Sequence, residues 1–214
     1  MIPLLLDLRD REVCIFGAGR VALRKARLFS NYARVRVVSD SFHPEFEDLS
    51  VRKVRARVVD PEEYIGNAFI IVPATDDREV NSRIMKTAHR LGRLVDSVDG
   101  VGDIIVPSIL KKGDIVIAIS TSGKSPGLSR HLRRKLEESI GPAWESMVRL
   151  QSHLRALLKA RLGEQTEREG ILRRCLEDER VWKALEEGDE KEAWSLAAEI
   201  AGLETRGDGV QHEK

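Results

Sequence analysis

The 214-residue chain has few aromatic residues, only two cysteines and no long apolar run. Two cysteines, Cys14 and Cys175, are too few for a disulfide framework or a cysteine-based zinc site. No apolar stretch approaches the roughly 20 residues that a membrane-spanning helix needs, and no basic region precedes an apolar core near the N-terminus. We therefore expect a cytoplasmic protein with no membrane partner.

A charge excess of one sign is also lacking, because 36 Lys and Arg residues nearly balance 35 Asp and Glu residues. The overall charge therefore indicates no particular class of partner. The chain has no helix-turn-helix pattern and no basic patch interleaved with aromatic residues, so we expect no nucleic-acid binding. None of the five histidines forms a metal-ligand pair such as H-x-x-x-H, so we expect no stable metal site.

The first hundred residues alternate strand-like and helix-like segments. Such alternation predicts an α/β fold, with a mostly parallel sheet covered by helices on both faces. We expect strands at Glu12–Phe16, Arg34–Ser39, Val54–Val59, Ala68–Val72 and Arg93–Asp96. We expect helices at Arg20–Ser30, around His43–Leu49, around Pro61–Ile65 and at Arg78–Leu91.

The pattern changes after the fifth predicted strand. Two apolar runs, Ile104–Leu110 and Ile115–Ser120, flank a Gly-Asp pair and predict a β-hairpin. Exposed strands of this kind could pair across a dimer. The rest of the chain has helical periodicity. We expect helices at Leu128–Ser139, Pro142–Leu162, around Glu164–Glu187 and at Glu190–Ala201.

The segment that follows the first predicted strand reads G-x-G-x-x-A, from Gly17 to Ala22. In such a loop, Gly17 permits the tight turn and Gly19 leaves room for a pyrophosphate against bare backbone. Arg20 and Val21 open the next helix, whose free N–H groups favour phosphate binding. The segment therefore predicts a Rossmann-like dinucleotide site, although a purely structural turn is an alternative.

Asp40 directly follows the second predicted strand, about 20 residues after the glycine loop, where a carboxylate typically binds the adenosine ribose. We expect Asp40, with Ser41 beside it, to bind the cofactor. No arginine stands beside Asp40 in the sequence to receive a 2′-phosphate, so we expect NAD rather than NADP. Thr75 follows the fourth predicted strand, and its small side chain would let a dinucleotide pass. A turn aspartate with no ligand remains an alternative for Asp40.

Four acids lie at or beyond the ends of the last two predicted strands: Asp76, Asp77, Asp96 and Asp99. Asp76 and Asp77 are also well placed to cap the next helix. Asp99 lies beyond the fifth predicted strand, near where a nicotinamide ring would point. This position makes Asp99 a candidate for the reacting end of the site, although a capping or turn aspartate is an alternative.

The segment Ser120–Glu138 combines hydroxyl groups, free backbone N–H groups and cationic side chains. These groups together would form an anion receptor. A solvated basic helix face is the alternative. The candidate binding residues are Thr121, Ser122, Lys124, Ser125, Arg130 and Arg134.

The stretches LRDREVCIFGAGRVALRKARLF, PATDDREVN, VDSVD, VPSIL and STSGKSPGLSRHLRRKLEESIG resemble, in order and spacing, the siroheme synthase N-terminal family. The resemblance covers Met1 to about Pro142, and its most specific part runs from Ser120 to Leu136. Members are precorrin-2 dehydrogenases, and some are also sirohydrochlorin ferrochelatases. The resemblance implies a homodimer that oxidises precorrin-2 to sirohydrochlorin with NAD+ and, in chelating members, takes Fe2+ as a further substrate.

The resemblance also implies roles for individual residues. Asp99 aligns with the family's key aspartate, so the resemblance implies that Asp99 is the catalytic residue and acts as a general base. It also implies that the cations after Ser120 bind the carboxylates of the tetrapyrrole. Ser122 stands where the family often has glycine, and Asp96 stands where it often has asparagine. We expect no methyltransferase domain of the kind fused to some relatives, because the residues after Pro142 are too few and too helical for one.

We therefore expect an NAD-binding domain at residues 1–102, a dimerisation and substrate-binding region at 103–140, a helical domain at 141–204 and a disordered tail at 205–214. Two other functions remain open. One is a non-enzymatic, NAD-sensing regulatory module. The other is a dehydrogenase for a smaller carboxylate.

Overall fold

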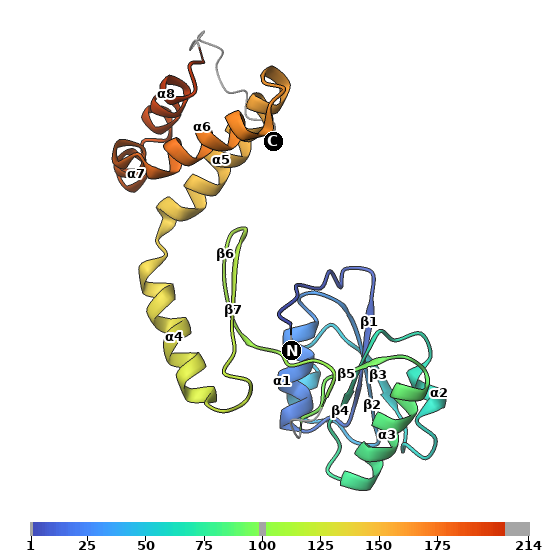
Figure 1. The fold of residues 1–214 in the computed structure, drawn as a ribbon. Coiled ribbons are helices and arrows are strands. Elements are labelled where there is room, and N and C mark those ends of the chain that lie inside the picture. Colours follow the sequence, from blue (N-terminus) through green and yellow to red (C-terminus); the bar gives the residue numbers. More distant parts are fainter. Residues whose placement is uncertain (1, 99–101, 204–214) are drawn as a thin grey trace. The chain divides into compact units, whose positions relative to one another are not determined.

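The computed structural model describes residues 2–98 and 102–203 of the chain (Figure 1). The chain forms two compact units, which comprise residues 1–106 and 107–214. The predicted tail at 205–214 and the predicted catalytic residue Asp99 lie outside the described residues.

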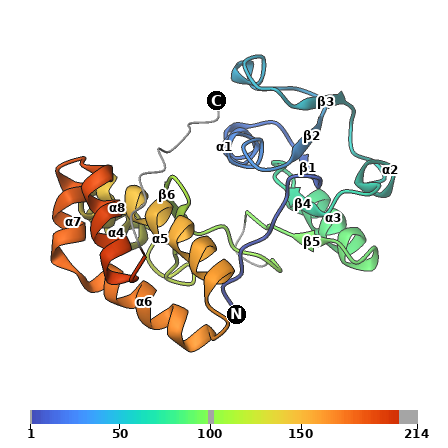
Figure 2. The same ribbon diagram turned by 90° about the horizontal axis from the view of Figure 1, so that it is seen from above.

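The first unit is built on a five-stranded parallel sheet with the strand order β3-β2-β1-β4-β5. Helices cover both of its faces, which confirms the predicted α/β class (Figure 2). The strands are β1 (Glu12–Phe16), β2 (Arg34–Ser39), β3 (Arg52–Arg55), β4 (Ile70–Pro73) and β5 (Leu94–Val95). The helices are α1 (Arg20–Phe29), the 3-10 helix η1 (Pro44–Phe46), α2 (Glu62–Ile65) and α3 (Arg78–Arg90).

The central strand β1 contributes side chains to two separate cores. Successive side chains of a strand point to opposite faces, so Val13 and Ile15 pack with α1 while Cys14 and Phe16 pack with α2 and α3. These four side chains have no exposed area. Burial raises the pKa of the Cys14 thiol to about 12, so this cysteine acts as a small apolar residue.

Three elements of the first unit differ most from the prediction. Strand β3 ends at Arg55 rather than Val59, because its pairing with β2 ends where Ser39 aligns with Arg55. Strand β5 has only two residues. The helix predicted around His43–Leu49 is the single turn η1, which the His43 ring caps by accepting from the Glu45 N–H.

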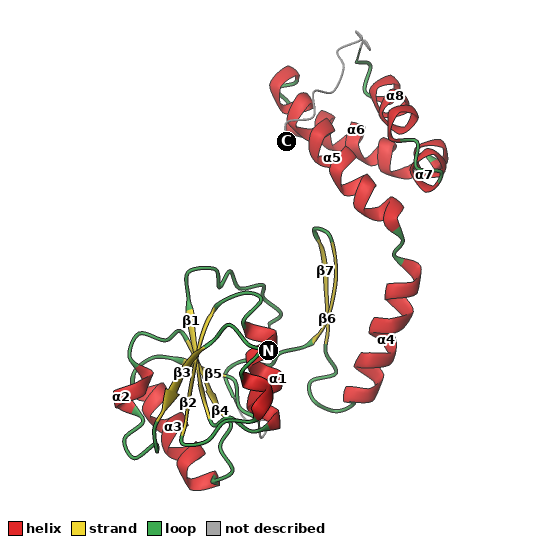
Figure 3. Ribbon diagram, turned by 180° about the vertical axis from the view of Figure 1, so that it is seen from behind, coloured by secondary structure: helices red, strands yellow, loops and turns green. Residues whose placement is uncertain are grey.

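The second unit begins with a two-stranded antiparallel hairpin, β6 (Ser108–Lys112) and β7 (Ile115–Ile119) (Figure 3). The predicted hairpin is confirmed, but its first strand starts at Ser108 rather than Ile104. The N–H of Ile104 donates to the Val95 carbonyl of β5 at 3.2 Å, and Ile104 packs on the core of the first unit. Gly113 opens the turn with φ of 52°.

The helices of the second unit follow the predicted order. They are α4 (Pro126–Ser139), α5 (Pro142–Arg161), α6 (Gln165–Glu177), α7 (Glu179–Glu186) and α8 (Glu190–Ile200). The segment predicted around Glu164–Glu187 forms two helices, because Asp178 has an extended backbone and caps α7 by accepting from the Arg180 N–H. Helices α5 to α8 share one apolar core, which includes Leu154, Cys175 and Ala197.

Candidate functional site

A cavity of about 460 Å³ lies at the carboxyl ends of the first four strands of the sheet. In open α/β sheets, this edge is where ligands bind. The cavity brings together five residues that the sequence predicted separately for cofactor binding, namely Gly17, Gly19, Asp40, Ser41 and Thr75. Arg20 and Val21 open α1 next to the cavity and are not among its lining residues.

The two glycines of the turn meet different constraints. Gly17 has φ of 95°, and a Cβ atom there would lie 2.3 Å from the Ala74 carbonyl oxygen, so only glycine fits. A Cβ atom on Gly19 would meet no protein atom within 4 Å. Gly19 therefore leaves bare backbone open at the cavity wall, and no side chain caps the N-terminus of α1. This cradle fits the pyrophosphate of NAD.

Thr75 is held in the cavity wall by Asn81 of α3. The Thr75 N–H and hydroxyl both donate to the Asn81 Oδ1 atom, at 3.0 and 2.7 Å, and the Asn81 amide donates to the Thr75 carbonyl at 2.9 Å. Asn81 is buried. Asp77 accepts from the N–H groups of Glu79 and Val80 and so caps α3, as predicted. The sequence analysis did not identify Asn81, although a polar residue on the buried face of a predicted helix was a signal.

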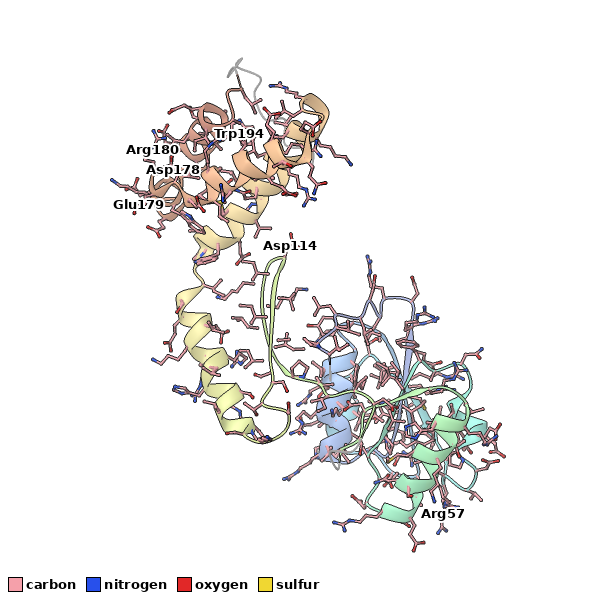
Figure 4. All side chains as sticks on the ribbon, in the orientation of Figure 1. Arg57, Asp114, Asp178, Glu179, Arg180 and Trp194 are labelled. Atoms are coloured by element: carbon pink, nitrogen blue, oxygen red, sulfur yellow. The ribbon has the colours of Figure 1, made fainter. Side chains whose placement is uncertain are left out.

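Asp40 and Ser41 lie at the part of the cavity formed by the ends of β2 and β3. The Ser41 hydroxyl donates to the Asp40 Oδ1 atom at 3.2 Å. Arg57, labelled in Figure 4, comes from the loop after β3. It lines the same cavity. The sequence analysis did not identify Arg57, because only the pairing of β2 with β3 brings it near Asp40.

Asp96, at the end of β5, forms a buried ion pair with Lys25 of α1. The Lys25 Nζ atom lies 2.6 Å from the Asp96 Oδ2 atom, and only 3% of the Asp96 side chain is exposed. Burial raises the pKa of the Asp96 carboxyl, and the Lys25 ammonium opposes this shift. The Asp96 carboxylate is therefore already paired with a cation of the protein itself.

The residues that follow 99–101 in the chain are held against β5. The Asp103 Oδ2 atom accepts from the Val95 N–H at 2.9 Å and lies 3.0 Å from the His89 Nε2 atom. Gly102 packs so closely on β5 that a Cβ atom there would lie 2.6 Å from the Val95 carbonyl oxygen. Asp96 and Asp103 therefore fix both flanks of the segment that carries Asp99.

In the second unit, the predicted anion receptor consists of the loop before α4 and the first turns of that helix. The Thr121 hydroxyl accepts from the Ser125 N–H at 3.0 Å, and the Ser125 hydroxyl caps α4 by accepting from the Leu128 N–H. Ser122 has φ of 53°, and it is the one non-glycine with positive φ among the residues that the structure describes. Its backbone conformation is therefore one that favours glycine.

The cations of this receptor region divide into two groups. Arg133 and Lys135 pair with Glu137 and Glu138 on the same helix, at 2.6 and 3.6 Å. In the described part of the chain, no carboxylate pairs with the exposed residues Lys124, Arg130 and Arg134. These three cations are available to an anionic ligand.

Residues 2–98 and 102–203 contain no group of three or more His, Cys, Asp or Glu side chains placed to hold a metal ion. No helix within the same ranges is both long and apolar enough to cross a membrane.

Two family models match the chain. One, described as "Putative NAD(P)-binding", matches residues 4–108, and the other, described as "Sirohaem biosynthesis protein central", matches residues 112–139. The first covers the cavity, and the second covers the whole receptor region.

Known proteins resemble the chain over nearly its whole length. The precorrin-2 dehydrogenase of Methanosarcina barkeri is 39% identical over 201 residues, which cover 90% of each chain. Siroheme synthase 1 of Aeromonas salmonicida is 34% identical over 214 residues, which cover 97% of this chain and 46% of that protein. The chain thus spans about half the length of that synthase. The fold matches that of SirC, precorrin-2 dehydrogenase, with a TM-score of 0.72 at 24% identity, over 93% of this chain and 100% of that chain.

Proposed function

The chain belongs to the precorrin-2 dehydrogenase family, and on that basis we propose that it oxidises precorrin-2 to sirohydrochlorin with NAD+. The observation that carries this proposal is the 39% identity to the Methanosarcina barkeri precorrin-2 dehydrogenase over 90% of both chains. The proposal places the chain in siroheme synthesis, in agreement with its siroheme synthase relatives.

The cavity of the first unit is the proposed NAD+ site. Gly17 and Gly19 would leave room for the pyrophosphate, the Asp40 carboxylate would accept hydrogen bonds from the ribose hydroxyls, and Thr75 would line the wall on the β4 side. NAD+, when bound, supplies the acceptor for the hydride that leaves the substrate. The chain's own groups must bind the macrocycle and remove a proton from it.

Asp99 is the proposed general base. The oxidation removes two electrons and two protons from precorrin-2, as one hydride and one proton, and a carboxylate can accept the proton. The flanks of this segment are held by the Asp96 N–H, which donates to the Ile71 carbonyl of β4, and by the Asp103 Oδ2 atom, which accepts from the Val95 N–H of β5. Exchange of Asp99 for Asn should abolish NADH formation and leave NAD+ affinity unchanged. Normal turnover by that variant would remove Asp99 from the mechanism.

The proposed substrate-binding groups are Thr121, Ser122, Ser125 and the free cations Lys124, Arg130 and Arg134. Precorrin-2 carries acetate and propionate carboxylates around its rim, and guanidinium groups bind carboxylates through paired hydrogen bonds. The three cations are exposed and have no carboxylate partner within the described residues, which supports this assignment.

We also propose that the chain forms a homodimer. Leu128, Leu132 and Leu136 follow one another every fourth residue on α4 and are 49%, 41% and 36% exposed, so they form an apolar stripe. Arg130 and Arg134 lie about half a turn away from this stripe. One side of α4 could thus pack on a second copy while the other side binds the anion. Light scattering should give the mass of a dimer, and Leu132→Glu should reduce it to that of a monomer.

Insertion of Fe2+ into sirohydrochlorin is a second candidate activity. It is favoured by relatives named siroheme synthase, which are 34% and 32% identical over 97% of this chain. Fe2+ would then be a substrate rather than a resident cofactor.

A cytoplasmic location and the division of residues 103–204 into two regions also remain predictions.

One experiment tests the proposed function. The purified chain is incubated anaerobically with precorrin-2 and NAD+, and absorbance spectra follow NADH and sirohydrochlorin. Formation of both supports the proposal, and addition of Fe2+ then shows whether siroheme forms. Binding of NAD+ without any NADH formation would instead support an NAD-sensing module.

A further inference from the structure

Arg57 is an exposed cation in the wall of the proposed cofactor cavity. Asp40 lines the same cavity. Within the described residues, neither side chain forms an ion pair, with the other or with a third group. Both charges are therefore free to act on a ligand.

The pairing of β2 with β3 explains why these two residues share a cavity. Ser39 aligns with Arg55, and the Ala56 N–H donates to the Ser39 carbonyl at 2.9 Å. Adjacent strands lie about 4.8 Å apart. The backbone that carries Arg57 therefore leaves the sheet next to the backbone that carries Asp40.

The two side chains favour different cofactors. A carboxylate at the end of β2 accepts hydrogen bonds from the ribose hydroxyls and repels a phosphate on the 2′ oxygen. A guanidinium group binds a phosphate through parallel hydrogen bonds and balances its charge. The cavity thus holds a group that selects NAD+ and a group that suits NADP+.

We propose that Arg57 is a specificity-determining residue, able to bind the 2′-phosphate of NADP+, and that the Asp40 carboxylate keeps the site selective for NAD+. This inference rests on the proposed function, because it requires the adenosine end of the cofactor to lie between these residues. It follows that loss of the charge at Asp40 will shift the preference toward NADP+, and only while Arg57 is present.

Titration calorimetry of the full chain tests the inference by measuring the Kd of NAD+ and of NADP+ without any turnover. The proteins are the wild type, Asp40→Ser, Arg57→Gln, the double variant Asp40→Ser with Arg57→Gln, and Asp40→Ser with Arg55→Gln as a matched control. Arg55 is an exposed arginine of β3 that does not line the cavity. Thermal unfolding checks that each variant is folded.

Asp40→Ser should strengthen NADP+ binding about tenfold and weaken NAD+ binding about as much. Added Arg57→Gln should abolish the gain for NADP+, whereas added Arg55→Gln should preserve it. A gain that survives Arg57→Gln, or no gain at all, would overturn the inference. An equal loss of affinity for NAD+ and NADP+ in the single variant Arg57→Gln would also overturn the inference. It would indicate that Arg57 contacts the adenine ring, which both cofactors share. A wild type that binds neither cofactor would overturn the proposed function and this inference with it.

Discussion

Asn81 holds Thr75 by three hydrogen bonds, so that one buried side chain of α3 fixes the end of β4. The same stretch of backbone approaches the glycine turn, because a Cβ atom on Gly17 would lie 2.9 Å from the Thr75 nitrogen. The position of the cavity wall therefore depends on a residue that does not itself line the cavity.

The first prediction concerns Asn81→Asp. This change preserves the acceptor for the Thr75 N–H but removes the amide that donates to the Thr75 carbonyl, and it adds a charge near the pyrophosphate site. We expect the KM for NAD+ to rise about tenfold, while the KM for precorrin-2 stays unchanged. Steady-state kinetics measure both constants. Asn67→Asp, at an exposed position, is the control, and an equal rise of both KM values would contradict a specific effect on the NAD+ site.

The two glycines of the turn provide the second prediction. Gly17→Ala should lower the stability of the fold by about 2 kcal/mol, because the added carbon lies 2.3 Å from the Ala74 oxygen and the residue has positive φ. Gly19→Ala should leave stability nearly unchanged, since its Cβ atom meets nothing, but it should weaken NAD+ binding by filling the cradle. Calorimetric unfolding and titration separate the two effects. Equal losses of stability would contradict the distinction.

The sequence pattern predicts the bounds of a strand correctly where residues next to each other in the chain determine those bounds. The bounds of β1 are as predicted, because an apolar run there ends at a glycine turn. The bounds of β3 differ, because Val54, Ala56 and Val58 alternate as a strand does while only the register with β2 decides how much of the segment pairs. Sequence patterns indicate which side chains face the core, but the residue at which a strand ends depends on the strand with which it pairs.

The same distinction applies to the candidate site. Gly17, Asp40 and Thr75 are predictable because each follows directly from the end of a strand. Arg57 and Asn81 are not, because one needs the pairing of β2 with β3 and the other needs the packing of α3 on β4. Residues that follow a strand in the chain can therefore be predicted from the sequence, whereas residues that reach the cavity or its wall through the packing of a second element cannot.

The third prediction concerns the buried ion pair. Lys25→Met should lower stability by about 3 kcal/mol near neutral pH, because it leaves the Asp96 carboxylate buried without a partner. Asp96 already has a raised pKa when folded, so protonation favours the folded state and stability is lost as the pH rises through that value. Without Lys25 the pKa rises further. The loss should therefore shrink as the pH falls, which thermal unfolding across a pH series will show.

The double variant Lys25→Met with Asp96→Asn is the control for this pair. It removes both charges and should recover most of the lost stability, because a buried pair can be replaced at little cost when neither charge remains. A double variant as unstable as Lys25→Met, or a loss that does not depend on pH, would assign the effect to packing of the lysine stem.

The fourth prediction concerns Ser122, whose backbone has positive φ. Ser122→Gly should raise the stability of the second unit by about 1 kcal/mol, since glycine adopts this conformation without steric cost. Ser120→Gly is a matched control in the same loop, where φ is not positive and the Ser120 hydroxyl accepts from the Ser122 N–H. There the same substitution should lower stability. Thermal unfolding measures both, and a loss in both variants would contradict the argument.

The fifth prediction compares cations on α4. Arg130 and Arg134 have no carboxylate partner within the described residues, whereas Arg133 pairs with Glu137 at 2.6 Å. Arg130→Gln and Arg134→Gln should each raise the KM for precorrin-2 about tenfold, because each removes a charged hydrogen bond to a rim carboxylate. Arg133→Gln should change it much less, since its guanidinium is already engaged. The Kd of NAD+ should stay the same in all three variants. If the three substitutions raise the KM equally, α4 acts only through its overall charge, and the assignment of Arg130 and Arg134 as direct ligands is wrong.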